Sequence, residues 1–235
     1  MNTVDASAIP VGQNRSMLNQ LDLDKLWDFG DPVASEERLR HAAESSEDRD
    51  ELLTQVARAL GLQGRFDEAH ALLDSLPDDG VRVPLERGRL RNSAGDPAGA
   101  IPLFAEAAEN AAGFLRVDAL HMLAIADSDH AAEWTRKGLA EVEASSDART
   151  KRWKTSLLNN HGWSLHDAGD LDGALAAFES ARDAAVTDEQ KHIANWTVAH
   201  TLRLLGRRGE ARQILESLDA SDPYVGEELD ALGAD

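Results

Sequence analysis

The residues best able to do chemistry in this sequence are its eight histidines and a short stretch around Ser164. Residues 162–166 (Gly-Trp-Ser-Leu-His) are similar to a nucleophile elbow, but they lack its second glycine and no strand is expected before them. A phosphate-binding loop needs glycines followed by Lys-Ser or Lys-Thr at a fixed offset, and the sequence contains none. We therefore assign no catalytic residue from motifs alone.

The histidine and carboxylate spacings do not predict a metal site either. His161 and His166 are separated by about 140° around a helix, and His192 and His200 by about 12 Å along one. Neither pair can hold one ion together. Residues 22–33 begin like a calcium loop but have tryptophan at its sixth position and valine at its twelfth. With no cysteine in the chain, thiolate ligands and disulfides are excluded, and we expect neither a metal nor a cofactor.

The charge balance argues against nucleic acid and lipid surfaces as partners. The 235 residues include 43 carboxylates against 24 Lys and Arg, a net charge of −19 that repels phosphate groups. We expect no basic cluster to offset this field, and no apolar run approaches the roughly 20 residues of a membrane span. The N-terminus shows no secretory signal, and the lack of cysteine suits a reducing compartment, so a cytoplasmic location is expected.

The elements that would position any site are indicated by a phrase that recurs along the chain. It consists of a glycine, an alanine five residues later and a bulky residue four further on. It occurs at Gly64, Gly95, Gly169 and Gly206, and a copy at Gly30 has serine in the alanine slot. The glycines are spaced by 34, 31, 74 and 37 residues, and the longest interval fits two units. A period of about 35 residues is typical of a helical repeat array.

Each slot of the phrase has a physical reason. Glycine accepts the left-handed backbone conformation that ends a helix. Asp31, Asp96 and Asp170 follow it as N-caps of the next helix. Pro32 and Pro97 then suit the first helical position. The alanine allows the two helices to cross closely, and the bulky residue lies on the same helix face. Each unit is therefore predicted to be a pair of helices, A and B.

This repeat resembles the tetratricopeptide repeat (TPR) family, whose unit is 34 residues long. The resemblance covers about residues 50–218 and is closest over residues 160–181. It implies an all-α fold, a right-handed α-α superhelix (TPR solenoid) of about five helix-pair repeats plus an N-terminal capping half-repeat. The family has small residues at positions 8, 20 and 27 of each repeat, which fall here on Ala57, Ala69 and Leu76; Gly88, Ala100 and Ala107; Gly162, Ala174 and Ala181; and Ala199, Ala211 and Leu218.

We expect one continuous array with a flanking segment at each end. Residues 1–16 are predicted to be a disordered tail, residues 17–48 the N-terminal capping helix or helices, and residues 49–235 the TPR array with a short C-terminal capping helix. Trp27 and Phe29 are expected to pack beneath the N-terminal cap.

Two repeats depart from the pattern. The third is degenerate, with helix A expected at 118–126, helix B at 128–144 and a shortened turn between them; Ala124 is taken as its eighth position. In the fourth, helix A is expected to be extended, from an Asp147 cap to Asp167.

The resemblance implies a binding groove, because helices A line the concave surface in the family. It suggests a peptide or protein partner held there, with arginines for a carboxylate and asparagines for backbone amides. The Lys/Asn order with which some members bind peptide C-termini is not reproduced. The family's groove positions give these candidate ligand-binding residues: Arg58, Arg89, His121, Asn159, Asn160, Trp163, His166, Trp196, His200 and Arg203.

Alternatives stay open for these residues. The arginines either attract an anionic ligand or pair with neighbouring carboxylates, and Trp163 and Trp196 either stack on a ligand or pack between adjacent helices. A small-molecule sensor or enzyme using the same groove is the alternative function, with His121, Asn159 and His166 as the residues to converge. The sequence does not indicate the oligomeric state.

Overall fold

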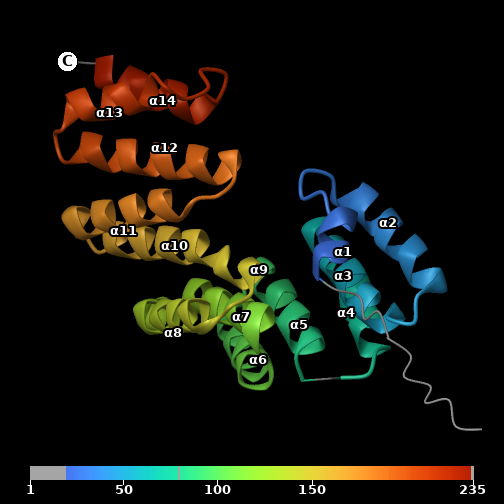
Figure 1. The fold of residues 1–235 in the computed structure, drawn as a ribbon. Coiled ribbons are helices and arrows are strands. Elements are labelled where there is room, and N and C mark those ends of the chain that lie inside the picture. The colour runs from blue at the N-terminus through green and yellow to red at the C-terminus, as the bar shows by residue number, and fades with distance from the viewer. Residues whose placement is uncertain (1–19, 79, 234–235) are drawn as a thin grey trace, which may run out of the picture.

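The computed structural model describes residues 20–78 and 80–233, which contain helices and no strand. Successive helix pairs stack side by side from the N-terminal to the C-terminal end (Figure 1). The expected tail, residues 1–16, lies outside the described residues. The pairs are α3 (Arg49–Leu62) with α4 (Phe66–Asp74), α5 (Arg82–Ser93) with α6 (Pro97–Asn110), α7 (Gly113–Ala126) with α8 (Ala131–Ala144), α10 (Trp153–Asp167) with α11 (Leu171–Ala184), and α12 (Asp188–Leu204) with α13 (Arg208–Leu215).

Shorter elements and single helices complete the stack. At the N-terminal end these are α1 (Gln20–Leu26) and α2 (Pro32–Ser45), and at the C-terminal end α14 (Pro223–Gly233). Between the third and fourth pairs lies α9 (Ala148–Lys151), and a 3-10 turn, η1 (Ser128–His130), precedes α8. No helix in the described ranges is long and apolar enough to cross a membrane.

The turn chemistry of the repeats is confirmed. Asp31, Asp96 and Asp170 accept hydrogen bonds from backbone N–H groups in the first turn of α2, α6 and α11, at 2.9 to 3.0 Å. The glycines of the four full phrases have φ between 75° and 84°, which only glycine adopts without strain. Gly30 is the exception: its φ is not positive, and its N–H instead binds the Asp28 carboxylate at 3.0 Å.

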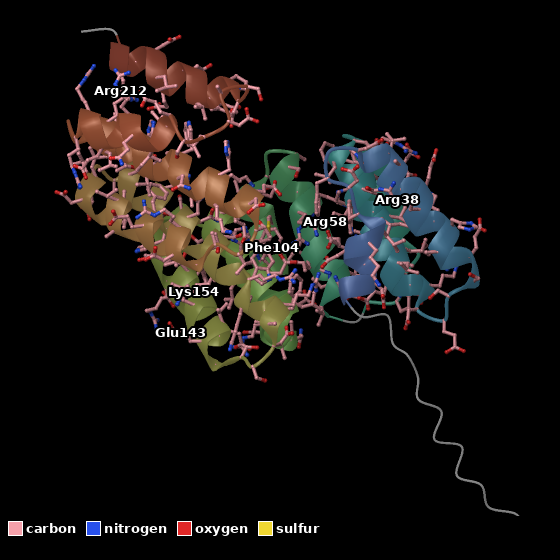
Figure 2. All side chains as sticks on the ribbon, turned by 45° about the horizontal axis from the view of Figure 1, so that its top comes forward. Arg38, Arg58, Phe104, Glu143, Lys154 and Arg212 are labelled. Carbon is pink, nitrogen blue, oxygen red and sulfur yellow. The ribbon has the colours of Figure 1, made fainter. Side chains whose placement is uncertain are left out.

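The small positions form the crossings of helices A and B. Ala57, Ala69, Ala100 and Ala174 are fully buried, as are the other alanines at these positions. The bulky residue of each phrase fills the space beside them, and in two repeats its ring takes the place of a missing side chain. A Cβ added to Gly88 would lie 2.5 Å from Phe104. Figure 2 labels Phe104 near the middle of the stack.

The register of the third repeat differs from the expected one. Its fully or nearly buried small residues are Ala119, Ala131 and Gly138, whereas Ala124 is half-buried. Their spacings of 12 and 7 residues match those of Gly88, Ala100 and Ala107 in the preceding repeat. Helix A of this repeat also begins earlier, at Gly113, and η1 replaces the glycine turn.

The long helix A expected in the fourth repeat is interrupted at Arg152. Asp147 caps it as predicted, accepting hydrogen bonds from the backbone N–H groups of Arg149 and Thr150. The Arg152 N–H then binds the carbonyl of Arg149, only three residues back, so one tight turn separates α9 from α10.

Enlarging a crossing alanine should destabilise the protein. Ala174→Leu is expected to lower the free energy of unfolding by about 1–3 kcal/mol, since the added atoms have no room between α10 and α11. Urea denaturation would measure the change. Ala176→Leu on the exposed face of the same helix is the control and should stay within about 0.5 kcal/mol of wild type. Equal midpoints for both variants would contradict the packing described here.

Candidate binding groove

The candidate groove residues fall into three groups along the A helices. Arg58 and Arg89 lie on α3 and α5; His121, Asn159 and Asn160 lie on α7 and α10; the remaining five lie on α10 and α12. The first and third groups are engaged mainly with other parts of the chain. The second group lines a pocket.

Arg89 is bound to carboxylates of the chain itself. Its guanidinium donates to Glu86 Oε1 at 2.7 Å and to a carboxylate oxygen of Asp118 on the next A helix. The Arg89 side chain is 11% exposed and those of Glu86 and Asp118 at most 5%, so the charges are largely removed from water. Arg89 thus follows the second alternative: its charge neutralises buried carboxylates.

Arg58 makes no ion pair within the described part of the chain. Its guanidinium carbon lies 5.4 Å from the Trp27 ring centre and 5.2 Å from that of Phe29, within cation–π range. Burial lowers the pKa of Arg58, and the nearby charge of Arg89 adds to this effect. The two rings stack on each other 4.9 Å apart. Phe29 is 62% exposed, so it covers Arg58 from outside and is not packed beneath the cap as expected.

His121, Asn159 and Asn160 meet in a polar pocket between α7, α10 and α12. The pocket has a volume of about 270 Å³ and is also lined by Thr155, Ser156, Gln190, Ile193 and Ala194. Asn160 Nδ2 donates to His121 Nδ1 at 3.2 Å, so Nδ1 is the unprotonated ring nitrogen. Two buried oxygens, Asn159 Oδ1 and Thr155 Oγ1, have no hydrogen-bond partner. His166, the third residue expected to converge here, lies elsewhere.

His121 should titrate far below an ordinary histidine. Burial lowers its pKa to about 4, and the opposing charge of Asp118 does not overcome this. An unfolded histidine has a pKa of about 6.5, so the unfolded chain binds this proton first. Stability should therefore fall as the pH drops from about 6.5 to 4, by about 2 kcal/mol for this half-buried ring. NMR titration of the ring measures the pKa, and His121→Gln should lack this part of the slope. A pKa of 6 or above would contradict the assignment.

The third group is an aromatic cluster at the C-terminal end of the groove. Trp196 stacks on His200 at 5.3 Å, and Trp163 lies 6.3 Å from Trp196, measured between ring centres. His166 lies 5.6 Å from His200 in the same cluster. Both tryptophans are half-buried. They pack between neighbouring helices, which is one of the two alternatives given for them above, the other being stacking on a ligand.

Two polar members of this group, Arg203 and His200, bind the C-terminal helix. Arg203 donates to both carboxylate oxygens of Glu228 on α14, at 2.6 and 3.1 Å, and His200 Nδ1 lies 2.9 Å from the same carboxylate. Arg203, like Arg89, is therefore neutralised within the chain. Among the described residues, no group of three or more His, Asp or Glu is placed to hold a metal ion.

Further groove residues come from α9 and the break that follows it. Arg149 lies over the Phe114 ring, 3.8 Å from its centre, and forms an ion pair with Asp24 of α1. Arg152 borders the same small pocket, together with Trp153, Ser156 and Gln190. The last two residues also line the polar pocket around Asn159. Residues 149–154 contain four cations, and this cluster is the sequence signal that marks the region. The expectation of no basic cluster was therefore wrong.

These features define an all-α solenoid of helix-pair repeats with a polar pocket among its A helices. Two family models, described as "Tetratricopeptide repeat" and "Tetratrico peptide repeat", match residues 55–75 and 157–234. The chain therefore contains tetratricopeptide repeats over these two ranges. The crystal structure of a tetratricopeptide repeat protein from Parabacteroides merdae has a similar fold, with a TM-score of 0.57 and 17% sequence identity. The match covers 89% of this chain and 83% of that one. No curated protein matches the sequence significantly.

Proposed function

We propose that the groove of this protein binds an extended, carboxylate-bearing segment of a protein partner, with the polar pocket at its centre. Tetratricopeptide repeats in general form protein-interaction modules. The proposal therefore concerns where on this chain the partner binds and which of its groups are recognised.

The observation that carries the proposal is the pair of unsatisfied oxygens in the polar pocket. A buried acceptor without a donor costs about 1–3 kcal/mol, and Asn159 Oδ1 and Thr155 Oγ1 are both in this state. A ligand that supplies N–H groups relieves this cost once the Asn159 and Thr155 side chains turn these oxygens toward the pocket that the two residues line. His121 is neutral at pH 7, so the pocket offers hydrogen bonds but no charge of its own. Peptide amides match this chemistry.

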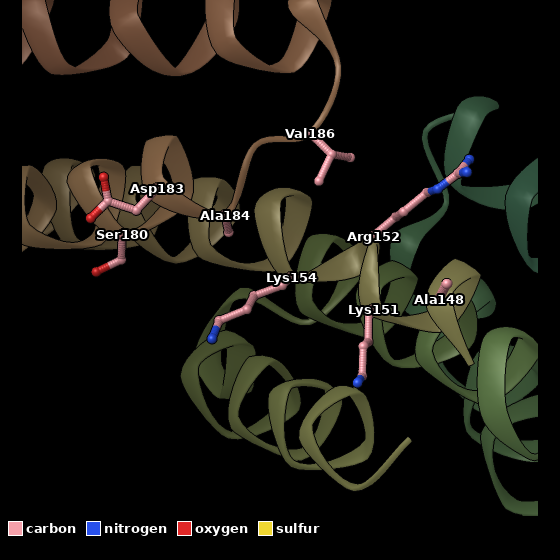
Figure 3. A pocket seen from close by; sticks show the side chains of 8 residues that line it. All are labelled: Ala148, Lys151, Arg152, Lys154, Ser180, Asp183, Ala184 and Val186. Atoms are coloured by element: carbon pink, nitrogen blue, oxygen red, sulfur yellow. The ribbon is translucent and has the colours of Figure 1, made fainter. Parts of the chain in front are cut away.

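A carboxylate of the partner would be received beside the pocket. Arg89 and Arg203 are already bound to internal carboxylates. Arg152 is exposed, makes no ion pair within the described residues and shares its small pocket with Ser156 and Gln190 of the polar pocket. Figure 3 shows the Arg152 side chain pointing away from Lys151 and Lys154. An arginine can bind a carboxylate through two parallel hydrogen bonds.

Peptides selected by the full chain from a random display library should depend on the polar pocket. Asn159→Ala and Asn160→Ala are each expected to weaken binding by about tenfold, because each removes hydrogen-bonding groups from a buried site. Arg152→Ala should weaken binding similarly and make it less sensitive to salt. Isothermal titration calorimetry measures both effects.

The matched control is Arg136→Ala, an exposed arginine of α8 that makes no ion pair within the described part of the chain. Its affinity should stay within about twofold of wild type. Selected peptides that bind all four variants equally would refute the groove as the binding site. A compact small molecule that protects Asn159 and His121, with no peptide selected, would favour the sensor or enzyme alternative.

A further inference from the structure

The N-terminal helix α1 reaches across to the fourth repeat. Asp24 on α1 accepts hydrogen bonds from Arg149 Nε at 3.1 Å and Nη2 at 2.6 Å, although the two residues are 125 positions apart. Figure 1 shows α1 on the side of the N-terminal helices that faces α9. Asp24 therefore lines the small pocket beside the polar pocket, the place where the proposed function puts a partner's carboxylate.

The Arg149 site is larger than its present occupant needs. Arg149 Nη1 is buried and has no hydrogen-bond partner, although the other two nitrogens bind Asp24. Arg152 borders the same pocket without an ion pair in the described residues. Two arginines and one carboxylate thus line the same pocket, and the N–H groups of one buried nitrogen, Arg149 Nη1, remain to be satisfied. The site is built for an anion and is only partly filled by Asp24.

The residues that follow α1 make the other contacts that a bound peptide would make. Trp27 Nε1 donates to the side-chain oxygen of buried Gln55 at 3.2 Å, and the rings of Trp27 and Phe29 cover Arg58. Residues 22–29, the groove segment, thereby contact two arginines, Arg58 and Arg149, neither of which has a buried carboxylate partner. They do so with one carboxylate and two aromatic rings.

Few side chains of the groove segment are buried. Leu23 is its one fully buried side chain, whereas Asp24 is 46% and Phe29 62% exposed. Helix α1 has seven residues, which is too short to be stable by itself. Besides Leu23, it is attached through Leu26, whose side chain packs against the core and whose carbonyl accepts a hydrogen bond from Arg38 Nε at 3.0 Å, and through Asp24 and Trp27. A ligand offering the same groups could replace the last two.

We infer that the groove segment is a displaceable internal ligand, and that the partner of the groove is an acidic segment with an aromatic residue close to its carboxylate. This rests on the proposed function and names the chemistry of the partner. The carboxylate of the partner takes the place of Asp24 on Arg149 and Arg152. The aromatic residue takes the place of Trp27 over Arg58. Removing the internal carboxylate favours the incoming one.

A labelled synthetic peptide of residues 20–30 tests this on the full chain by fluorescence anisotropy. Asp24→Asn in the chain should tighten binding of the peptide by about fivefold to tenfold, because the internal competitor loses its ion pair. Asp24→Asn in the peptide should abolish this gain in affinity. Arg149→Gln in the chain should weaken peptide binding at least tenfold, while Arg136→Gln should leave it unchanged. Equal binding to wild type and Asp24→Asn, or binding indifferent to Arg149, would overturn the inference.

Hydrogen exchange separates displacement from a purely structural role of α1. In the Asp24→Asn chain, the amides of residues 22–26 should exchange faster while the urea midpoint stays unchanged. Unchanged exchange in α1 would show that it is a fixed cap, which overturns the inference. The proposed function is judged separately: library-selected peptides that depend on Asn160 uphold it even when the 20–30 peptide fails to bind.

Discussion

Replacing Phe178 by alanine should lower the free energy of unfolding by about 3–5 kcal/mol. The ring is fully buried between α10 and α11, and it meets Trp163 edge-to-face with ring centres 5.3 Å apart. One edge of the ring lies against Gly162, which has no side chain to collapse into the vacated space. The cavity should therefore stay open, which places the cost in the upper range for such substitutions. Equilibrium urea denaturation followed by circular dichroism measures the change.

A double-mutant cycle with Gly162 gives the internal control. A Cβ at Gly162 would lie 2.4 Å from Phe178 Cε1, so Gly162→Ala alone should be destabilising. In the Phe178→Ala background this clash is absent, so Gly162→Ala should lower the free energy of unfolding much less. The two changes are therefore expected to be non-additive by more than about 1 kcal/mol. Additivity within about 0.5 kcal/mol would show that glycine and ring do not share this space.

The fold could be predicted from the sequence because each repeat is specified locally. In the fourth repeat, Gly169 turns the chain, Asp170 caps the next helix, and Ala174 and Phe178 pack the crossing, all within ten residues. The third repeat lacks this phrase, so its register was missed. Its turn is fixed instead by Asp127, which accepts a hydrogen bond from Trp134 Nε1 at 2.9 Å. That contact uses residue types that do not mark a turn in other repeats.

The site was harder to predict because its partners are distant in sequence. Periodicity places Arg89 and Arg203 on A helices, but each also binds a carboxylate of a neighbouring element, Asp118 and Glu228, which lie 29 and 25 residues further on. Asp24 and Arg149 are separated by more than half of the chain. Such pairs depend on how the repeats curve relative to one another, which spacing within a repeat does not encode. Of the three residues expected to converge, His121 and Asn159 line one pocket because they belong to adjacent A helices, whereas His166 does not line it.

Arg89→Met should be among the most destabilising single substitutions in the groove, with a loss of about 3–5 kcal/mol at pH 7. The change removes the cation that both Glu86 and Asp118 bind and leaves two buried carboxylates facing each other. Methionine fills much of the same volume, so the loss reports mainly on charge. Urea denaturation at several pH values measures it, and Arg136→Met on the surface should stay within about 0.5 kcal/mol of wild type.

The pH dependence identifies the cause of the loss. In the wild type, burial alone would raise the pKa of Asp118, but Arg89 and Arg58 outweigh burial and hold the pKa below its ordinary value. The wild type therefore keeps this contribution above pH about 4 and loses it as the pH falls through the lowered pKa. In Arg89→Met, burial is no longer opposed by Arg89 and the pKa should rise, so the folded variant takes up protons at higher pH than the unfolded chain. The stability deficit should hence be largest at neutral pH and shrink as the pH falls towards 4. A deficit that is independent of pH would mean that Arg89 contributes packing and not charge.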